Sequence, residues 1–244
     1  MTDFLSALSG LSSTTVLIAL VVAPSLLVIL ADWRALNVLL GAEYVLIGVF
    51  LIVSRIEDFP AELAIVKTLV GVMIVPVLYI SARRARWGKN PDEEEDDEIK
   101  TPQQRFEWLR APGPSTAPST ALRAGLRTGL ALRAIVALLG AAVALSLALR
   151  YPIQFAASQA SSRDITIATF VLIGQGLLNI ALNENPLKVG LGLLTVTAGF
   201  ELFFVLVEPS LLVVALLGFV NLIIALALSY LVTAWATRPR GVPR

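Results

Sequence analysis

The chain has 244 residues, of which 57% are hydrophobic, and its 19 basic and 18 acidic side chains give a formal net charge of +1. Cysteine and histidine are both absent, which excludes iron–sulfur clusters, the usual haem and zinc ligand sets, and Ser-His or Cys-His nucleophile pairs. The carboxylates show no spacing suited to Mg²⁺ or Ca²⁺. We therefore expect no cofactor, no metal, no nucleic-acid partner and no catalytic centre within this chain.

Seven segments are apolar enough, and close enough to 20 residues long, to cross a bilayer as helices. They are Thr15–Ala31, Ala35–Val53, Ala61–Ser81, Ala131–Leu149, Ile165–Leu182, Leu187–Val207 and Ser210–Trp235. The expected fold class is therefore an all-α integral membrane protein with seven transmembrane helices.

The basic residues predict how these helices are oriented, because cytoplasmic loops are rich in Lys and Arg. If the N-terminus is outside, fifteen of the nineteen Lys and Arg residues lie in the cytoplasm, including Arg34, Lys188 and all those of the 83–133 segment. Lys67 lies within a helix, and three remain outside, namely Arg55, Arg150 and Arg163. We expect a multi-pass protein of the prokaryotic cell (inner) membrane with its C-terminus in the cytoplasm.

Glu43 lies near the middle of the second predicted helix and hence near the bilayer midplane. An ionisable side chain at that depth is costly and usually faces the interior of a helix bundle or an ion path. A buried carboxyl group that exchanges its proton is what a proton relay requires. The alternative is a neutral Glu43 that only joins helices by hydrogen bonds.

Lys67 lies six residues into the third predicted helix, at a depth of about 9 Å. At that depth a lysine can extend its ammonium group back to the membrane surface. The alternative is that Lys67 pairs with a buried acid. Because side chains lean toward the N-terminus of their own helix, Lys67 leans outward and Glu43 inward, so a water bridge between them is favoured over direct contact.

The segment 83–130 is polar and contains the acidic run Asp92–Glu98 followed by the Pro/Ser/Thr/Ala stretch Ala111–Thr120. Like charges in a block repel one another, and Pro-rich polar sequence cannot form a core. We predict a disordered cytoplasmic linker, with a docking site for a basic partner as the alternative. The residues 131–150 then form a linking transmembrane helix.

Polar side chains recur in the second half of the chain. Gln175, Asn179 and Asn183 follow one another at four-residue intervals, so they share one face of the fifth predicted helix, and Asn221 lies in the seventh. Such amides can simply bond neighbouring helices. Alternatively, they extend the polar axis begun by Glu43 and Lys67.

Glu201 lies about seven residues from the outer end of the sixth predicted helix, close to the level of Lys67. An ion pair between Lys67 and Glu201 is therefore a hypothesis, and whether Lys67 pairs with Glu201 or with Glu43 stays open at this point. As candidates for a proton or ion path we take Glu43, Lys67, Glu201, Gln175, Asn179 and Asn221.

The two sides of the linker also align with each other. A shift of 151 residues places 34–41 on 185–192 and Gly48 on Gly199. This alignment predicts a duplication, with the residues 1–82 and 151–244 as two three-helix repeats. Because each repeat would begin outside, the repeats would be parallel rather than inverted.

Two stretches of the first half carry a family resemblance. The sequence Gly41-Ala42-Glu43 resembles the Gly-x-Glu of the small three-helix subunit K of respiratory complex I. The third helix of that subunit bears a second Glu shortly before a Gly, and here Lys67 stands at that place, before Gly71. The whole layout is similar to hydrogenase-4 component E, a seven-helix relative with a Lys in its third helix shortly before a Pro, as Lys67 precedes Pro76.

The resemblance implies a non-catalytic membrane-arm subunit of a redox-driven proton or sodium pump. Its partners would be the larger antiporter-like membrane subunits of a hetero-oligomeric complex. The second half departs from the family pattern, because Gln175, Thr197 and Asn221 occupy positions where the family favours ionisable residues. Glu201, one turn from Thr197, would replace the missing carboxylate.

Two other classes of function remain open. A stand-alone small transporter would need a substrate site at the midplane, for which two three-helix units with few polar residues leave little room. A membrane scaffold or assembly protein would act through the acidic linker.

Overall fold

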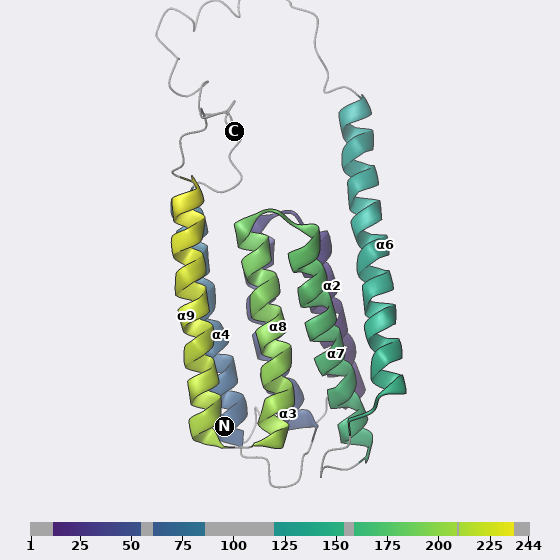
Figure 1. Cartoon of the computed structure of the whole chain (residues 1–244), viewed down its shortest axis with the longest axis vertical. Coiled ribbons are helices and arrows are strands. Elements are labelled where there is room, and N and C mark those ends of the chain that lie inside the picture. The colour runs from purple at the N-terminus through teal and green to yellow at the C-terminus, as the bar shows by residue number, and fades with distance from the viewer. Residues whose placement is uncertain (1–11, 55–60, 86–119, 154–158, 209, 237–244) are drawn as a thin grey trace, which may run out of the picture.

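The computed structural model describes residues 12–54, 61–85, 120–153, 159–208 and 210–236. Its regular secondary structure in these ranges is entirely helical (Figure 1). The helices are α2 (Ser13–Ile29), α3 (Trp33–Val53), α4 (Ala61–Arg84), α6 (Thr120–Arg150), α7 (Gln159–Leu182), α8 (Pro186–Val207) and α9 (Leu211–Ala236). The prediction of an all-α fold with one helix at each of the seven apolar segments is confirmed.

Six of these helices are long and apolar enough to cross a membrane. The remaining apolar helix, α2, has 17 residues, which is at the lower limit for a span. Large apolar side chains lie on the outside of the bundle; Leu138, Leu212 and Tyr230, for example, are each more than 70% exposed. A surface of this kind is suited to lipid, and the chain is a multi-pass membrane protein.

Polar residues set the starts of three helices. The side chains of Ser12, Asp32 and Asn185 each accept a hydrogen bond from a backbone N–H in the first turn of α2, α3 and α8, respectively. Such N-caps satisfy donors that the helix itself leaves free. The connections before α3 and α8, residues 30–32 and 183–185, are short. Therefore α2 and α3, and likewise α7 and α8, are antiparallel neighbours.

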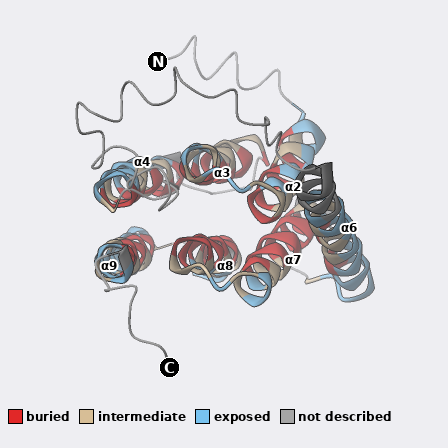
Figure 2. Cartoon of the chain, turned by 90° about the horizontal axis from the view of Figure 1, so that it is seen from above, coloured by how far each residue is buried: buried red, intermediate tan, exposed pale blue. Residues whose placement is uncertain are grey.

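The helices form two layers of three, with α6 at one side (Figure 2). One layer contains α2, α3 and α4, and the other contains α7, α8 and α9. Across the interface α2 packs on α7 and α4 packs on α9, while α3 and α8 touch less extensively. The helix α6 packs outside them, against α7 and α2.

Opposed helices of the two layers run in the same direction. Ser13, at the start of α2, donates a hydrogen bond of 3.2 Å to Asp164, near the start of α7. Ser81 and Ser229, toward the ends of α4 and α9, share another. The two layers therefore have the same order and direction of helices.

The glycines that align between the two halves have different neighbours. A Cβ atom added to Gly41 or Gly48 would meet Val75 or Thr68 of α4. A Cβ atom added to Gly199 would instead meet Leu172, on α7. At these glycines α3 packs closely on α4, whereas α8 packs closely on α7. The duplication itself stays a prediction.

The linker is shorter than predicted. The helix α6 begins at Thr120 rather than at residue 131, so the last residues of the predicted 83–130 linker are helical. The apolar criterion finds only the part of a helix that lies in the bilayer, whereas Ala and Leu also favour the helix beyond it. The acidic run Asp92–Glu98, and with it the prediction of disorder, lies outside the described residues.

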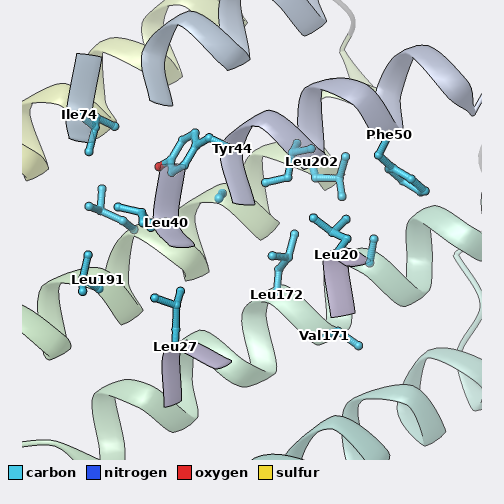
Figure 3. Close-up of a cluster of buried hydrophobic side chains, with 14 of the residues drawn as sticks. Leu20, Leu27, Leu40, Tyr44, Phe50, Ile74, Val171, Leu172, Leu191 and Leu202 are labelled. Atoms are coloured by element: carbon cyan, nitrogen blue, oxygen red, sulfur yellow. The ribbon is translucent and has the colours of Figure 1, made fainter. Parts of the chain in front are cut away.

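The core lies between the layers and is mainly aliphatic (Figure 3). Leu20, Leu40, Leu172 and Leu191, from four different helices, are fully buried. Tyr44 is the largest side chain among these buried residues, and its exposed fraction is 0%. The aliphatic core thus holds a phenol ring, and Lys67 lies beside it.

Candidate functional site

Lys67 of α4 and Glu201 of α8 form an ion pair in the interior of the bundle. Lys67 lies six residues after the start of α4, and Glu201 six residues before the end of α8, so the two lie at the same depth from one end of the bundle. Both residues are only 4% exposed. The predicted pairing of Lys67 with Glu201 is confirmed.

Asn221 of α9 binds the second oxygen of the Glu201 carboxylate. Its Nδ2 donates a hydrogen bond of 2.7 Å to Glu201 Oε1, while Glu201 Oε2 faces Lys67. Asn221 starts deeper in the bundle than Glu201, and its side chain reaches back toward the N-terminus of α9, as helical side chains do. Both carboxylate oxygens therefore have donors, which lowers the cost of burying the charge.

The ring of Tyr44 lies beside the same ammonium group. Lys67 Nζ is 4.8 Å from the centre of the Tyr44 ring, within the range of a cation–π interaction. Gly71, one turn after Lys67, makes room for this ring, because a Cβ atom there would lie 2.7 Å from Tyr44 Cγ. Sequence reasoning missed Tyr44, although an aromatic residue directly after Glu43 was a usable signal.

Glu43 lies next to this group but is not bound directly to Lys67. It is fully buried, and the Thr195 hydroxyl donates a hydrogen bond of 3.2 Å to its Oε2. Among the described residues it has no ion-pair partner within 4.0 Å, yet the charges of Glu43 and Lys67 act on each other. This agrees with the expectation that the two groups are neighbours without direct contact.

Three buried polar atoms at this place have no hydrogen-bond partner among the described residues. They are Glu43 Oε1, the Tyr44 hydroxyl oxygen and Asn221 Oδ1. An unpaired buried polar atom costs about 1–3 kcal/mol, and buried water commonly binds such atoms. We define Glu43, Tyr44, Lys67, Glu201 and Asn221 as the polar centre.

Gln175 and Asn179 are engaged elsewhere. Gln175 Nε2 donates a hydrogen bond of 2.8 Å to the backbone oxygen of Ala137 on α6. Asn179 Nδ2 donates one of 3.1 Å to the backbone oxygen of Lys188 on α8. Both amides thus join α7 to a neighbouring helix, and no described contact connects them with the polar centre.

In the described part of the chain, no three Asp or Glu side chains gather as a metal ion would require. The polar centre offers two carboxylates and one ammonium group. Its side chains can therefore hold and exchange protons.

Comparison with protein-family models, with curated proteins and with solved structures finds no match to this chain.

Proposed function

We propose that the chain is a non-catalytic membrane subunit of a redox-driven, proton- or sodium-translocating complex of the complex I and membrane-bound hydrogenase type. In this proposal it sits in a prokaryotic cell (inner) membrane beside antiporter-like subunits, with its N-terminus outside. Its own contribution is the polar centre, which forms part of the ion-translocation axis.

The observation that carries this proposal is the ion pair between Lys67 and Glu201. Burying two charges in a bilayer costs several kcal/mol per ion before pairing, so a protein that needed only a membrane anchor would gain nothing from it. The pair also joins the two layers, because Lys67 belongs to one layer and Glu201 to the other.

The arrangement suits proton transfer by coupled changes of charge. Lys67 interacts with Glu201 on one side and with the charge of Glu43 on the other. Interacting groups titrate as a unit, so a proton that arrives at Glu43 alters how firmly Lys67 holds Glu201. A neighbouring subunit that changes the charge near Glu43 would thereby change proton binding at Lys67 and Glu201.

Purification of the tagged chain in a mild detergent, followed by mass spectrometry of the proteins that co-purify, tests this proposal. We expect antiporter-like membrane subunits together with redox subunits. The same partners should co-purify with Glu43→Gln, since that change keeps the shape of the side chain. Recovery of the chain alone, or only as a homo-oligomer, would contradict the proposal and favour a stand-alone transporter.

A further inference from the structure

A second buried cation lies apart from the polar centre. Lys188 is the third residue of α8 and only 5% exposed. Its Nζ has no hydrogen-bond acceptor among the described residues. A buried ammonium group without a partner is costly, so a bound anion would stabilise the protein at this position.

Arg133 of α6 supplies a second positive charge at the same level of the bundle. The hydrogen bond from Gln175 to Ala137 sets the level at which α6 and the antiparallel α7 meet. One turn from that contact, Arg133 on α6 reaches the level of Asn179 on α7, whose amide binds the Lys188 backbone oxygen. The positive charge of the half-buried Arg133 acts on Lys188, which adds to the cost of burying the Lys188 ammonium group.

The described residues contain no acid that neutralises this pair. Their one ion pair within 4.0 Å is Lys67–Glu201. Glu184, the nearest acid in sequence to Lys188, is exposed and forms no such pair. We name Arg133 and Lys188 the cationic pair.

The cationic pair lies near the bilayer edge. Arg133 and Lys188 are both close to the beginning of their membrane-spanning segments, at the end of the bundle that also bears Arg34 and Arg84. Below Arg133, the outward side of α6 exposes Ile135 and Leu138, at 55% and 72%. The cationic pair therefore lies next to an apolar surface of α6 that suits the acyl chains of a lipid whose headgroup binds there.

We propose that Arg133 and Lys188 form a binding site for a phosphate-bearing anion, supplied by the headgroup of an anionic phospholipid. Two cations suit a phosphodiester, since Arg binds its oxygens through a planar fork and Lys acts as a point charge. The site joins α6 to the rest of the bundle at the membrane surface, independently of any ion transport.

The test uses the full chain, stripped of lipid in mild detergent. Its unfolding temperature is measured during titration with phosphatidylglycerol, phosphatidylethanolamine or inorganic phosphate, and bound lipid is counted by native mass spectrometry. We expect phosphatidylglycerol to raise the Tm of the wild type by at least about 3 °C and to remain bound in the spectrometer. Phosphatidylethanolamine should have no such effect. An equal, saturable rise with inorganic phosphate at the same concentration would overturn the assignment to a lipid.

Lys188→Gln and Arg133→Gln should each lose the phosphatidylglycerol response by at least tenfold in apparent affinity, and Arg133→Lys should keep most of it. Arg150→Gln, which removes an exposed cation from the far end of α6, is the matched control and should respond as the wild type does. If Lys188→Gln does not fold, the proposal is tested by comparing the phosphatidylglycerol affinity of Arg133→Gln with that of Arg133→Lys. Equal binding of phosphatidylglycerol by the wild type and Arg133→Gln would overturn the proposal. These measurements do not depend on ion translocation, so they test the lipid site independently of the proposed function.

Discussion

Lys67 and Glu201 form a buried ion pair from helices that are diagonal to each other in the bundle. The helix α4 packs mainly on α3 and α9, whereas α8 packs mainly on α7 and α9. Two long side chains therefore bridge a separation that the helix backbones do not close. The pair is one of several polar contacts between the layers, and it explains why both charges can stay in the membrane interior.

Removal of either charge should destabilise the protein strongly. Lys67→Met or Glu201→Gln leaves the other residue buried without its ion partner, which costs about 3–5 kcal/mol. The double variant should recover much of that loss, because no unpaired charge remains. Thermal unfolding in detergent measures the effect. Exposed Arg163→Gln, as the control, should change stability by less than about 0.5 kcal/mol. If either single variant left both stability and ion translocation unchanged, the importance of the pair would be refuted.

Glu43→Gln should slow ion translocation strongly, with little effect on folding. The amide oxygen of Gln can still accept the hydrogen bond from Thr195, so the free energy of unfolding should fall by no more than about 1 kcal/mol. A group that cannot exchange protons should slow redox-driven transport at least tenfold. Dye quenching in inverted membrane vesicles, with and without sodium, measures that rate. Thr195→Val gives the complementary case, in which stability falls but the carboxyl group remains. Undiminished transport by Glu43→Gln would exclude Glu43 from the ion path.

Gly71→Ala should disturb the polar centre through packing alone. The new methyl group would collide with the Tyr44 side chain, and overpacking of this kind costs about 1–3 kcal/mol. Gly129→Ala is a matched control, because a Cβ atom there meets nothing within 4 Å and alanine favours the helix. The two unfolding temperatures should therefore move in opposite directions. A similar shift in both variants would show that Tyr44 does not fill the space beside Gly71.

Gln175→Leu should weaken the attachment of α6 without stopping ion translocation. The substitution removes the hydrogen bond to the backbone oxygen of Ala137, and such interhelical bonds contribute about 0.6 kcal/mol, with values up to about 1.7. Unfolding in detergent should detect this small loss, and vesicle assays should show normal transport. Loss of transport with intact stability would instead place Gln175 on the ion path, as the sequence-based hypothesis has it.

The orientation can be tested by cysteine labelling, because the chain contains no cysteine of its own. Arg163→Cys and Arg84→Cys introduce thiols at exposed positions, the first near the start of α7 and the second at the end of α4, which are opposite ends of the bundle. With the N-terminus outside, a membrane-impermeant maleimide added to intact spheroplasts should label Arg163→Cys at once. Arg84→Cys should react only after the membrane is opened. The reverse pattern would invert the predicted orientation.

The amino-acid sequence by itself determined the class of fold and the depth of each buried charge. Spans are readable because a helix in lipid needs a run of apolar residues, and depth follows from the constant rise per residue. Lys67 and Glu201 could therefore be matched by level alone. The start of α6 was less predictable, since hydropathy does not register a helix that continues beyond the membrane.

Only the tertiary structure decided which way each helix faces. In a helix that is apolar all round, no hydrophobic face indicates its rotation; contacts at small residues such as Gly71 and Gly192 decide it instead. That rotation placed Tyr44 beside Lys67, turned Gln175 toward α6 and buried Lys188, which sequence reasoning had counted only as a cytoplasmic charge. The polar centre and the cationic pair depend on these rotations. A side chain reaches only a few ångströms, so the rotation of its helix decides which groups it can contact.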